Sequence, residues 1–170
     1  QLKDSGAKAI FLLDNFANTL QKALPHTPEL KHIVVSKLGD LMGVKGHLVN
    51  FALKYVKKMI PEWKIDSAIS FKRLIADGRH LQMIPVALTH DDLAFLQYTG
   101  GTTGVAKGAM LTHGNLIANV MQVSAWCAPA FENMDANEQP VFLQALPLYH
   151  IFGFTAGAMY AMHIGGQLLL

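Results

Sequence analysis

The first 36 residues alternate between strand-like and helix-like segments, and this alternation restricts the fold more than any other feature. Residues 9–13 read Ala-Ile-Phe-Leu-Leu, and residues 16–24 carry apolar side chains at helical spacing before Pro25. Residues 32–36 read His-Ile-Val-Val-Ser, a β-branched run typical of a buried strand. Strand, helix and strand within about 28 residues predict a βαβ unit, and therefore a parallel sheet.

The alternation continues along the chain. Residues 46–60 keep a 3.6-residue hydrophobic period, residues 68–71 and 72–81 predict a short strand and a helix, and residues 93–98 predict a strong strand. Residues 151–170 carry no formal charge, but their internal glycines favour a buried helix followed by a strand over a membrane-spanning helix. The predicted fold is α/β, a three-layer subdomain built on a parallel sheet.

The composition excludes several classes of protein. With 51% hydrophobic and 15% charged residues, the chain is not intrinsically disordered. A single cysteine excludes a disulfide scaffold and favours a reducing cytoplasm. All fourteen Lys and Arg residues lie between Lys3 and Lys107. The basic stretch 45–79 is either a surface for anionic membrane or ligand or an ordinary solvated helix face; no interleaving of aromatic and basic residues indicates nucleic-acid binding.

The loop at residues 98–108 carries the clearest chemistry. It reads Tyr-Thr-Gly-Gly-Thr-Thr-Gly-Val-Ala-Lys-Gly, and a helical run to about Trp126 follows. Glycines free backbone N–H groups to face an anion, threonine hydroxyls add donors, and Lys107 supplies a charge suited to phosphate. Neither the Walker A spacing nor the dinucleotide-binding fingerprint matches. The pattern therefore predicts a polyphosphate site of another kind, with a plain surface turn as the alternative.

The loop closely resembles the phosphate-binding signature of the adenylate-forming superfamily, Tyr/Phe-Thr-Ser-Gly-Thr/Ser-Thr-Gly-x-Pro-Lys-Gly. It departs from that signature at Gly100 and Ala106. The stretches 92–115 and 146–153 (Leu-Pro-Leu-Tyr-His-Ile-Phe-Gly) are similar to the bacterial long-chain fatty acid–CoA ligases. The resemblance implies that residues 1–170 are part of the large N-terminal AMP-binding domain, truncated at both ends, with the C-terminal catalytic domain absent.

Enzymes of this family convert a carboxylate and ATP into an acyl-adenylate and pyrophosphate, and then transfer the acyl group to coenzyme A. The resemblance implies that ATP is held by Tyr98, Thr99, Gly100, Gly101, Thr102, Thr103, Gly104, Lys107 and Gly108. It also implies a catalytic role for Lys107 and places Mg²⁺ near Thr99 and Thr102.

The resemblance further implies that Tyr149, His150 and Gly153 border the substrate, with His150 acting in catalysis. Without it, a lone histidine in an apolar run predicts a core residue. His113 is expected at the start of the helix that follows the loop. Val120, Met121 and Trp126 are interpreted as helix core, with an acyl tunnel as the alternative. Gly153 and Gly157 either leave space for an alkyl chain or serve ordinary packing.

The expected partners are a long-chain fatty acid and coenzyme A, with ATP and Mg²⁺ as cofactors and no nucleic acid. The expected location is cytoplasmic, with peripheral contact to the inner face of the membrane, and the full-length protein is expected to form a homodimer. The later superfamily motifs are not present, so the chain alone is expected to be inactive. Two alternatives stay open: a ligase for aryl or medium-chain acids, and a non-catalytic nucleotide- or lipid-binding module.

Overall fold

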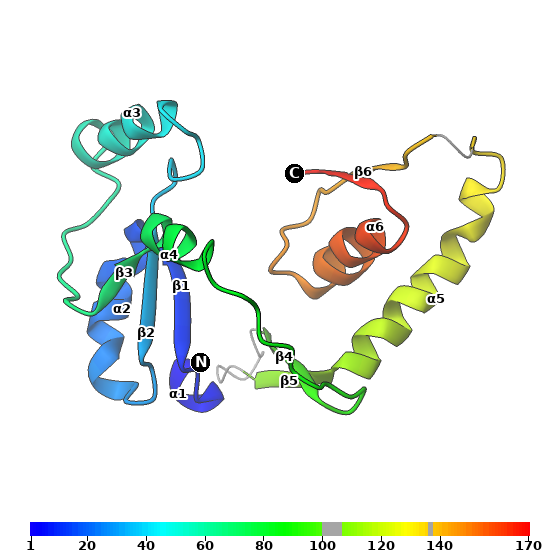
Figure 1. Ribbon diagram of the computed structural model, residues 1–170, viewed down its shortest axis with the longest axis horizontal. Helices are drawn as coiled ribbons and strands as arrows, with labels where there is room; N and C mark the ends of the chain where they lie inside the picture. Colours follow the sequence, from blue (N-terminus) through cyan, green and yellow to red (C-terminus); the bar gives the residue numbers. More distant parts are fainter. Residues whose placement is uncertain (100–106, 136–137) are drawn as a thin grey trace. The chain divides into compact units, whose positions relative to one another are not determined.

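The computed structural model describes residues 1–99, 107–135 and 138–170. The chain divides into two compact units, Gln1–Pro85 and Val86–Leu170 (Figure 1). Each unit is described by itself.

The first unit is built on a parallel sheet of strands β1 (Ala9–Leu13), β2 (His32–Ser36) and β3 (Ala68–Ser70), in the order β1-β2-β3. Ala9 pairs with His32, and Ile33 pairs with Ala68. The predicted βαβ unit is confirmed, and both of its strands have the predicted limits.

Helices precede, connect and follow these strands. They are α1 (Leu2–Ser5), α2 (Ala17–Ala23) between 3₁₀ turns at Asp14–Phe16 and Leu24–His26, α3 (Lys45–Phe51) and α4 (Phe71–Gly78). A π-helical turn, Ala52–Val56, extends α3. The helix expected over 46–60 therefore ends early, and Lys58 follows it with φ of 49°.

The core of the first unit lies between α2 and the sheet. Ala17 and Leu20 of α2 pack with Ile33 and Val35, which alternate onto one face of β2. Val34 points to the opposite face and is also buried, and α4 contacts β2. Burial on both faces explains why β2 reads as a continuous apolar run.

Asp14 is a carboxylate buried at the end of β1, only 6% exposed. Burial raises its pKa above 3.8, and Asp40 adds to the increase, whereas Lys37 opposes it. A raised pKa means that the folded state disfavours the ionised form, so ionised Asp14 destabilises the fold.

Asp14→Asn is therefore expected to raise the free energy of unfolding at pH 7. The gain should shrink as the pH falls through the raised pKa, because Asp14 of the unsubstituted chain then takes up a proton and loses its charge. Urea unfolding of both chains from pH 7 to pH 4 measures this difference. A gain that stays constant with pH would contradict a desolvated Asp14.

The second unit starts with strands β4 (Leu93–Thr99) and β5 (Lys107–Thr112), which pair antiparallel and lead into the long helix α5 (His113–Phe131). The remaining elements are β6 (Val141–Leu143), a π-helical segment η4 (Gly153–Met159), α6 (Tyr160–His163) and β7 (Gln167–Leu169). Strand β7 pairs parallel with β6. The predicted helix-then-strand arrangement of residues 151–170 is confirmed. Within the described ranges, no helix is long and apolar enough to cross a membrane.

Strands β5 and β6 were not predicted. The helix was expected to start near His113, as it does, but residues 107–112 before it were not predicted to form a strand; they pair with β4. Only then does α5 begin, where Thr112 Oγ1 accepts the Asn115 N–H at 3.2 Å and Asn115 Oδ1 accepts the Thr112 N–H at 3.0 Å. This reciprocal cap fixes the first turn of α5.

Candidate active site

The two ends of the glycine- and threonine-rich loop are held together by β4 and β5. Their register places Thr99 opposite Lys107 and Tyr98 opposite Gly108. Thr99 and Lys107 are both exposed. The Thr99 hydroxyl and the Lys107 ammonium group, both predicted to bind phosphate, therefore lie on neighbouring strands. We call this pair of positions, where the loop leaves and rejoins the two strands, the loop neck. The predicted loop residues Gly100, Gly101, Thr102, Thr103 and Gly104 lie outside the described residues.

Gly108 has a packing role in this stem. A Cβ atom placed on it would lie 3.0 Å from Cζ of Tyr98, which is tighter than most real Cβ contacts. The glycine therefore lets the Tyr98 ring lie against the opposite strand.

The start of α5 is tied to the segment before β4. The backbone N–H of His113 donates to the Asp92 carbonyl at 3.0 Å, and that of Gly114 donates to the His90 carbonyl at 2.8 Å. Asp92 Oδ2 accepts the Thr89 N–H and hydroxyl, and these bonds hold the pKa of Asp92 below its usual value. His113 lies at the start of the helix, as predicted. The hydrogen bonds to His90 and Asp92 hold the first turn of α5 in place.

The Tyr149-His150 segment is connected to the same strand that leads into the loop. Gln97 Nε2 on β4 donates to the Tyr149 carbonyl at 3.3 Å. The Phe152 N–H donates to His150 Nδ1 at 3.2 Å, so the neutral imidazole carries its proton on Nε2. His150 is exposed. It is therefore not the core histidine that its apolar surroundings suggested.

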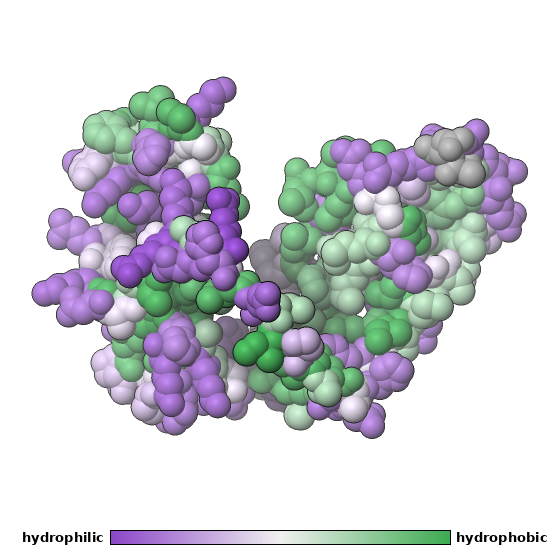
Figure 2. Space-filling view, viewed as in Figure 1, coloured by the Kyte–Doolittle hydropathy of each residue, from purple (hydrophilic) through white to green (hydrophobic). Residues whose placement is uncertain are grey.

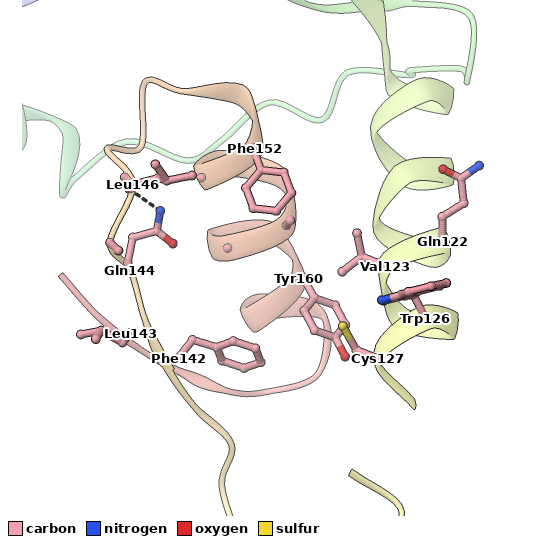
Figure 3. A pocket seen from close by; sticks show the side chains of 14 residues that line it. Gln122, Val123, Trp126, Cys127, Phe142, Leu143, Gln144, Leu146, Phe152 and Tyr160 are labelled. Carbon is pink, nitrogen blue, oxygen red and sulfur yellow. Dashed lines mark hydrogen bonds between the residues drawn. The ribbon is translucent and has the colours of Figure 1, made fainter. Parts of the chain in front are cut away.

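A cavity of about 700 Å³ opens beside this segment, between α5 and residues 142–160. Figure 3 shows Val123 and Trp126 of α5 facing Phe152 and Tyr160 across it. Most of its walls are apolar, from the residues Gln122, Val123, Trp126, Cys127, Phe142, Leu143, Gln144, Ala145, Leu146, Phe152, Gly153, Ala156, Gly157 and Tyr160. Burial raises the pKa of the Tyr160 hydroxyl, and Cys127 raises it further, so the group stays neutral. The cavity suits an uncharged chain better than an ionic ligand.

Gly153 and Gly157 line this cavity, but their immediate neighbour is Gln144. A Cβ on Gly153 would lie 2.7 Å from both Gln144 Nε2 and the Pro147 carbonyl oxygen, and one on Gly157 would overlap Gln144 Oε1. Gln144 Nε2 in turn donates to the Leu146 carbonyl. The two glycines therefore allow close packing against Gln144 and also line the cavity, and their role toward an alkyl chain stays a prediction.

The interpretation of α5 needs correction. Val120 is buried, as expected for core, but Trp126 is 87% exposed and Met121 is 53% exposed. Trp126 forms part of the cavity wall. Helix α5 is apolar around most of its circumference, so its hydrophobic pattern did not distinguish the packed face from the open one.

Two glutamines, Gln97 and Gln144, hold the site together and were not predicted. Gln97 bonds to a residue 52 positions away, and Gln144 lies against Gly153 and Gly157. Both are isolated amide side chains within apolar stretches of the sequence. A polar side chain in an apolar stretch needs a hydrogen-bond partner, and this requirement could have indicated their role.

In the parts of the chain that the structure describes, no group of three or more His, Cys, Asp or Glu side chains could hold a metal ion. Of the two threonines predicted to lie near Mg²⁺, Thr99 is described at the loop neck, and Thr102 lies outside the described residues. The described residues offer Mg²⁺ a hydroxyl but no cluster of carboxylates, which are the ligands it prefers.

Comparison with known proteins identifies the chain's relatives. A family model described as AMP-binding enzyme matches residues 1–170, the whole chain. The chain belongs to this family. It is 46% identical over 171 residues to the long-chain-fatty-acid–CoA ligase of Escherichia coli O157:H7, and 45% identical to that of Haemophilus influenzae. Each alignment covers 100% of this chain and 30% of the relative, so the chain spans about a third of the length of these AMP-binding enzymes.

Two solved structures of other proteins have the same fold. The adenylation and carrier didomain of the carboxylic acid reductase from Segniliparus rugosus, in complex with AMP, matches with a TM-score of 0.61 at 23% identity. The match covers 98% of this chain and 22% of that one. A red-emitting luciferase from Phrixothrix hirtus gives a TM-score of 0.58 at 16% identity, over 98% and 27% of the two chains. The predicted α/β fold of an AMP-binding enzyme, with its parallel sheet, is confirmed.

Proposed function

We propose that this chain is the part of an ATP-dependent long-chain fatty acid–CoA ligase that holds the ATP phosphates and the acyl chain. The full-length protein would join a fatty acid to ATP, release pyrophosphate from the acyl-adenylate, and pass the acyl group to coenzyme A. The identity of 45–46% to named ligases over the whole chain supports this activity.

The loop neck would bind the phosphates. Lys107 is an exposed cation paired with Thr99 across β4 and β5, and the two groups would stabilise the negative charge that develops on the departing pyrophosphate. The loop residues 100–104 would add backbone N–H donors. Mg²⁺ would supply further positive charge near Thr99 and Thr102, completed by carboxylates from beyond this chain.

The apolar cavity would take the alkyl chain. At about 700 Å³ it lies within the usual range for ligand sites, and each buried methylene contributes about 0.8 kcal/mol. Gly153, which lines the cavity, comes three residues after His150 in the sequence. A fatty acid whose alkyl chain fills the cavity would therefore direct its carboxylate toward Tyr149 and His150.

The single observation that carries the proposal is the hydrogen bond from Gln97 to the Tyr149 carbonyl. Gln97 lies two residues before Thr99 on β4, so this bond attaches the His150 segment to the stem of the phosphate loop. An acyl carboxylate beside His150 and an ATP phosphate at the loop neck would thus be held by one connected framework, as joining the two substrates requires.

Further assignments follow from the same proposal. Residues 1–170 would be part of the N-terminal AMP-binding domain, and the chain alone would have no turnover without the C-terminal domain. The full-length protein would act in the cytoplasm, on the inner face of the membrane, as a homodimer. Coenzyme A would be the acyl acceptor.

An aryl acid is the alternative substrate. The 4-coumarate–CoA ligase 1 of Solanum tuberosum is 31% identical over 140 residues, covering 81% of this chain and 24% of that enzyme. The apolar walls of the cavity favour an alkyl chain over a hydroxylated ring.

Acid-dependent ATP–pyrophosphate exchange by the full-length protein tests the proposal. We expect exchange with palmitate or oleate to exceed exchange with octanoate, and exchange with 4-coumarate to be at background. Dependence on 4-coumarate alone would overturn the fatty acid assignment, and no exchange with any acid would overturn the proposed activity.

A further inference from the structure

Gln144 places an amide side chain in the wall of the mostly apolar cavity beside α5. Figure 2 shows mainly hydrophobic surface where Figure 1 places α6 and the adjoining end of η4. In Figure 3, the Gln144 amide lies within this wall with its Nε2 toward Leu146, whereas the Gln122 amide extends away from Phe152 and Tyr160. Gln144 is therefore the amide that shapes the cavity on the side of η4.

The Gln144 residue is held at its backbone and at the end of its side chain. Its backbone N–H donates to the Leu169 carbonyl at 2.8 Å, which continues the pairing of β6 with β7. Its Nε2 donates to the Leu146 carbonyl. A side chain fixed in this way limits the space beside it, whereas a free one would move aside for a ligand.

Two glycines of η4 make room for this side chain. Gly153 and Gly157 are four residues apart and therefore lie on the same side of the helical segment. A Cβ on Gly153 would lie 2.7 Å from Gln144 Nε2, and one on Gly157 would overlap Gln144 Oε1. The amide therefore fills the space that side chains at both positions would occupy.

This part of the wall is the one nearest to His150 along the chain. Helical hydrogen bonding starts at His150, whose carbonyl accepts the Phe154 N–H at 2.9 Å, and Gly153 follows within the same turn. A fatty acid with its carboxylate beside His150 would pass Gln144 with the first carbons of its chain. The width of the cavity at Gln144 therefore bears on substituents close to the carboxylate and not on those at the far end of the chain.

We propose that Gln144 is a specificity-determining residue that narrows the cavity and selects straight-chain acids over acids with a methyl branch next to the carboxylate. The inference rests on the proposed function, because it takes the alkyl chain to lie in this cavity. Forcing one extra carbon into a filled apolar site is expected to lower activity about tenfold or more.

Two isomeric acids test this role in the full-length protein. 3-Methylhexadecanoate carries its branch near the carboxylate and 15-methylhexadecanoate carries it at the far end, so the two have the same composition. We expect kcat/KM for acid-dependent ATP–pyrophosphate exchange to be about tenfold or more lower for the 3-methyl acid. Gln144→Ala removes the carboxamide and one methylene, and it should raise the ratio of 3-methyl to 15-methyl activity about tenfold.

Two further variants separate the volume of the side chain from its hydrogen bond. Gln144→Met keeps the length of the side chain but loses the bond to the Leu146 carbonyl, and it should retain most of the discrimination. Gln139→Ala is the matched control, because Gln139 Nε2 also donates to a backbone carbonyl, that of Gly165 at 2.9 Å, and Gln139 does not line the cavity. It should leave the ratio unchanged, and circular dichroism checks that all variants fold.

The steric role of Gln144 is wrong if Gln144→Ala leaves the ratio unchanged, if Gln139→Ala raises it equally, or if Gln144→Met is as permissive as Gln144→Ala. Titration calorimetry gives the Kd of both acids and reads the same ratio without turnover. Exchange with an unchanged ratio would overturn the role of Gln144 and leave the ligase standing. Acid binding without any exchange would overturn the ligase, and the ratio of Kd values would then decide the role of Gln144.

Discussion

Replacing Lys107 with alanine in a full-length protein that carries this chain is expected to slow acid-dependent ATP–pyrophosphate exchange about 100-fold, the cost typical of losing one fixed group that stabilises transition-state charge. Lys107 lies opposite Thr99 at the neck of the loop, and the sequence has no Lys or Arg after it. No basic side chain from residues 108–170 can therefore replace its charge.

The effect should fall on the rate more than on ATP binding, because the charge on the leaving pyrophosphate is largest in the transition state. Measuring exchange and the Kd for ATP together separates the two. Lys22→Ala, at an exposed position on α2, is the matched control and should change neither quantity. An unchanged exchange rate in the Lys107 variant would remove its assigned role at the phosphates.

Filling the cavity at Ala156 is expected to discriminate between long and short acids. Ala156→Trp places an indole ring in the cavity wall, and excluding about four methylenes would cost about 3 kcal/mol at about 0.8 kcal/mol each. The kcat/KM for palmitate should therefore fall about 100-fold. That for octanoate, which fills less of the cavity, should fall much less.

Ala118→Trp provides the control for this substitution, since it adds the same ring to an exposed position of α5. It should leave the ratio of palmitate to octanoate activity unchanged. Equal losses for both acids in the Ala156 variant would mean that the cavity is not the acyl site, and thermal unfolding of both variants distinguishes this from general destabilisation.

Local sequence patterns predicted the first unit well. Strands β1 and β2 have the predicted limits because each is an uninterrupted apolar run that the sheet buries. The observed helices differ from the predicted ones by a few residues at their ends, because capping and π-helical turns determine where each helix stops. Helix α3 was expected to continue to residue 60, but it changes to a π-helical turn at Ala52 and the helical segment ends at Val56.

Pairings over long distances explain what local patterns missed. Strand β5 exists because β4 is available as its partner, and residues 107–112 alone do not indicate a strand. The bond between Gln97 and Tyr149 and the fit of Gln144 against two glycines depend on positions that only the fold brings together. Trp126 was misassigned because its apolar character fits a core and a cavity wall equally well.

The division of the chain at Pro85 and Val86 has a consequence for how such proteins diversify. The loop neck, the His150 segment and the apolar cavity all belong to residues 86–170. Mutations confined to this unit would therefore alter the cavity and the loop neck while leaving the sheet and core of residues 1–85 unaltered. Conversely, recombination near residue 85 between related genes would transfer the cavity and the loop neck together, because both lie in one unit.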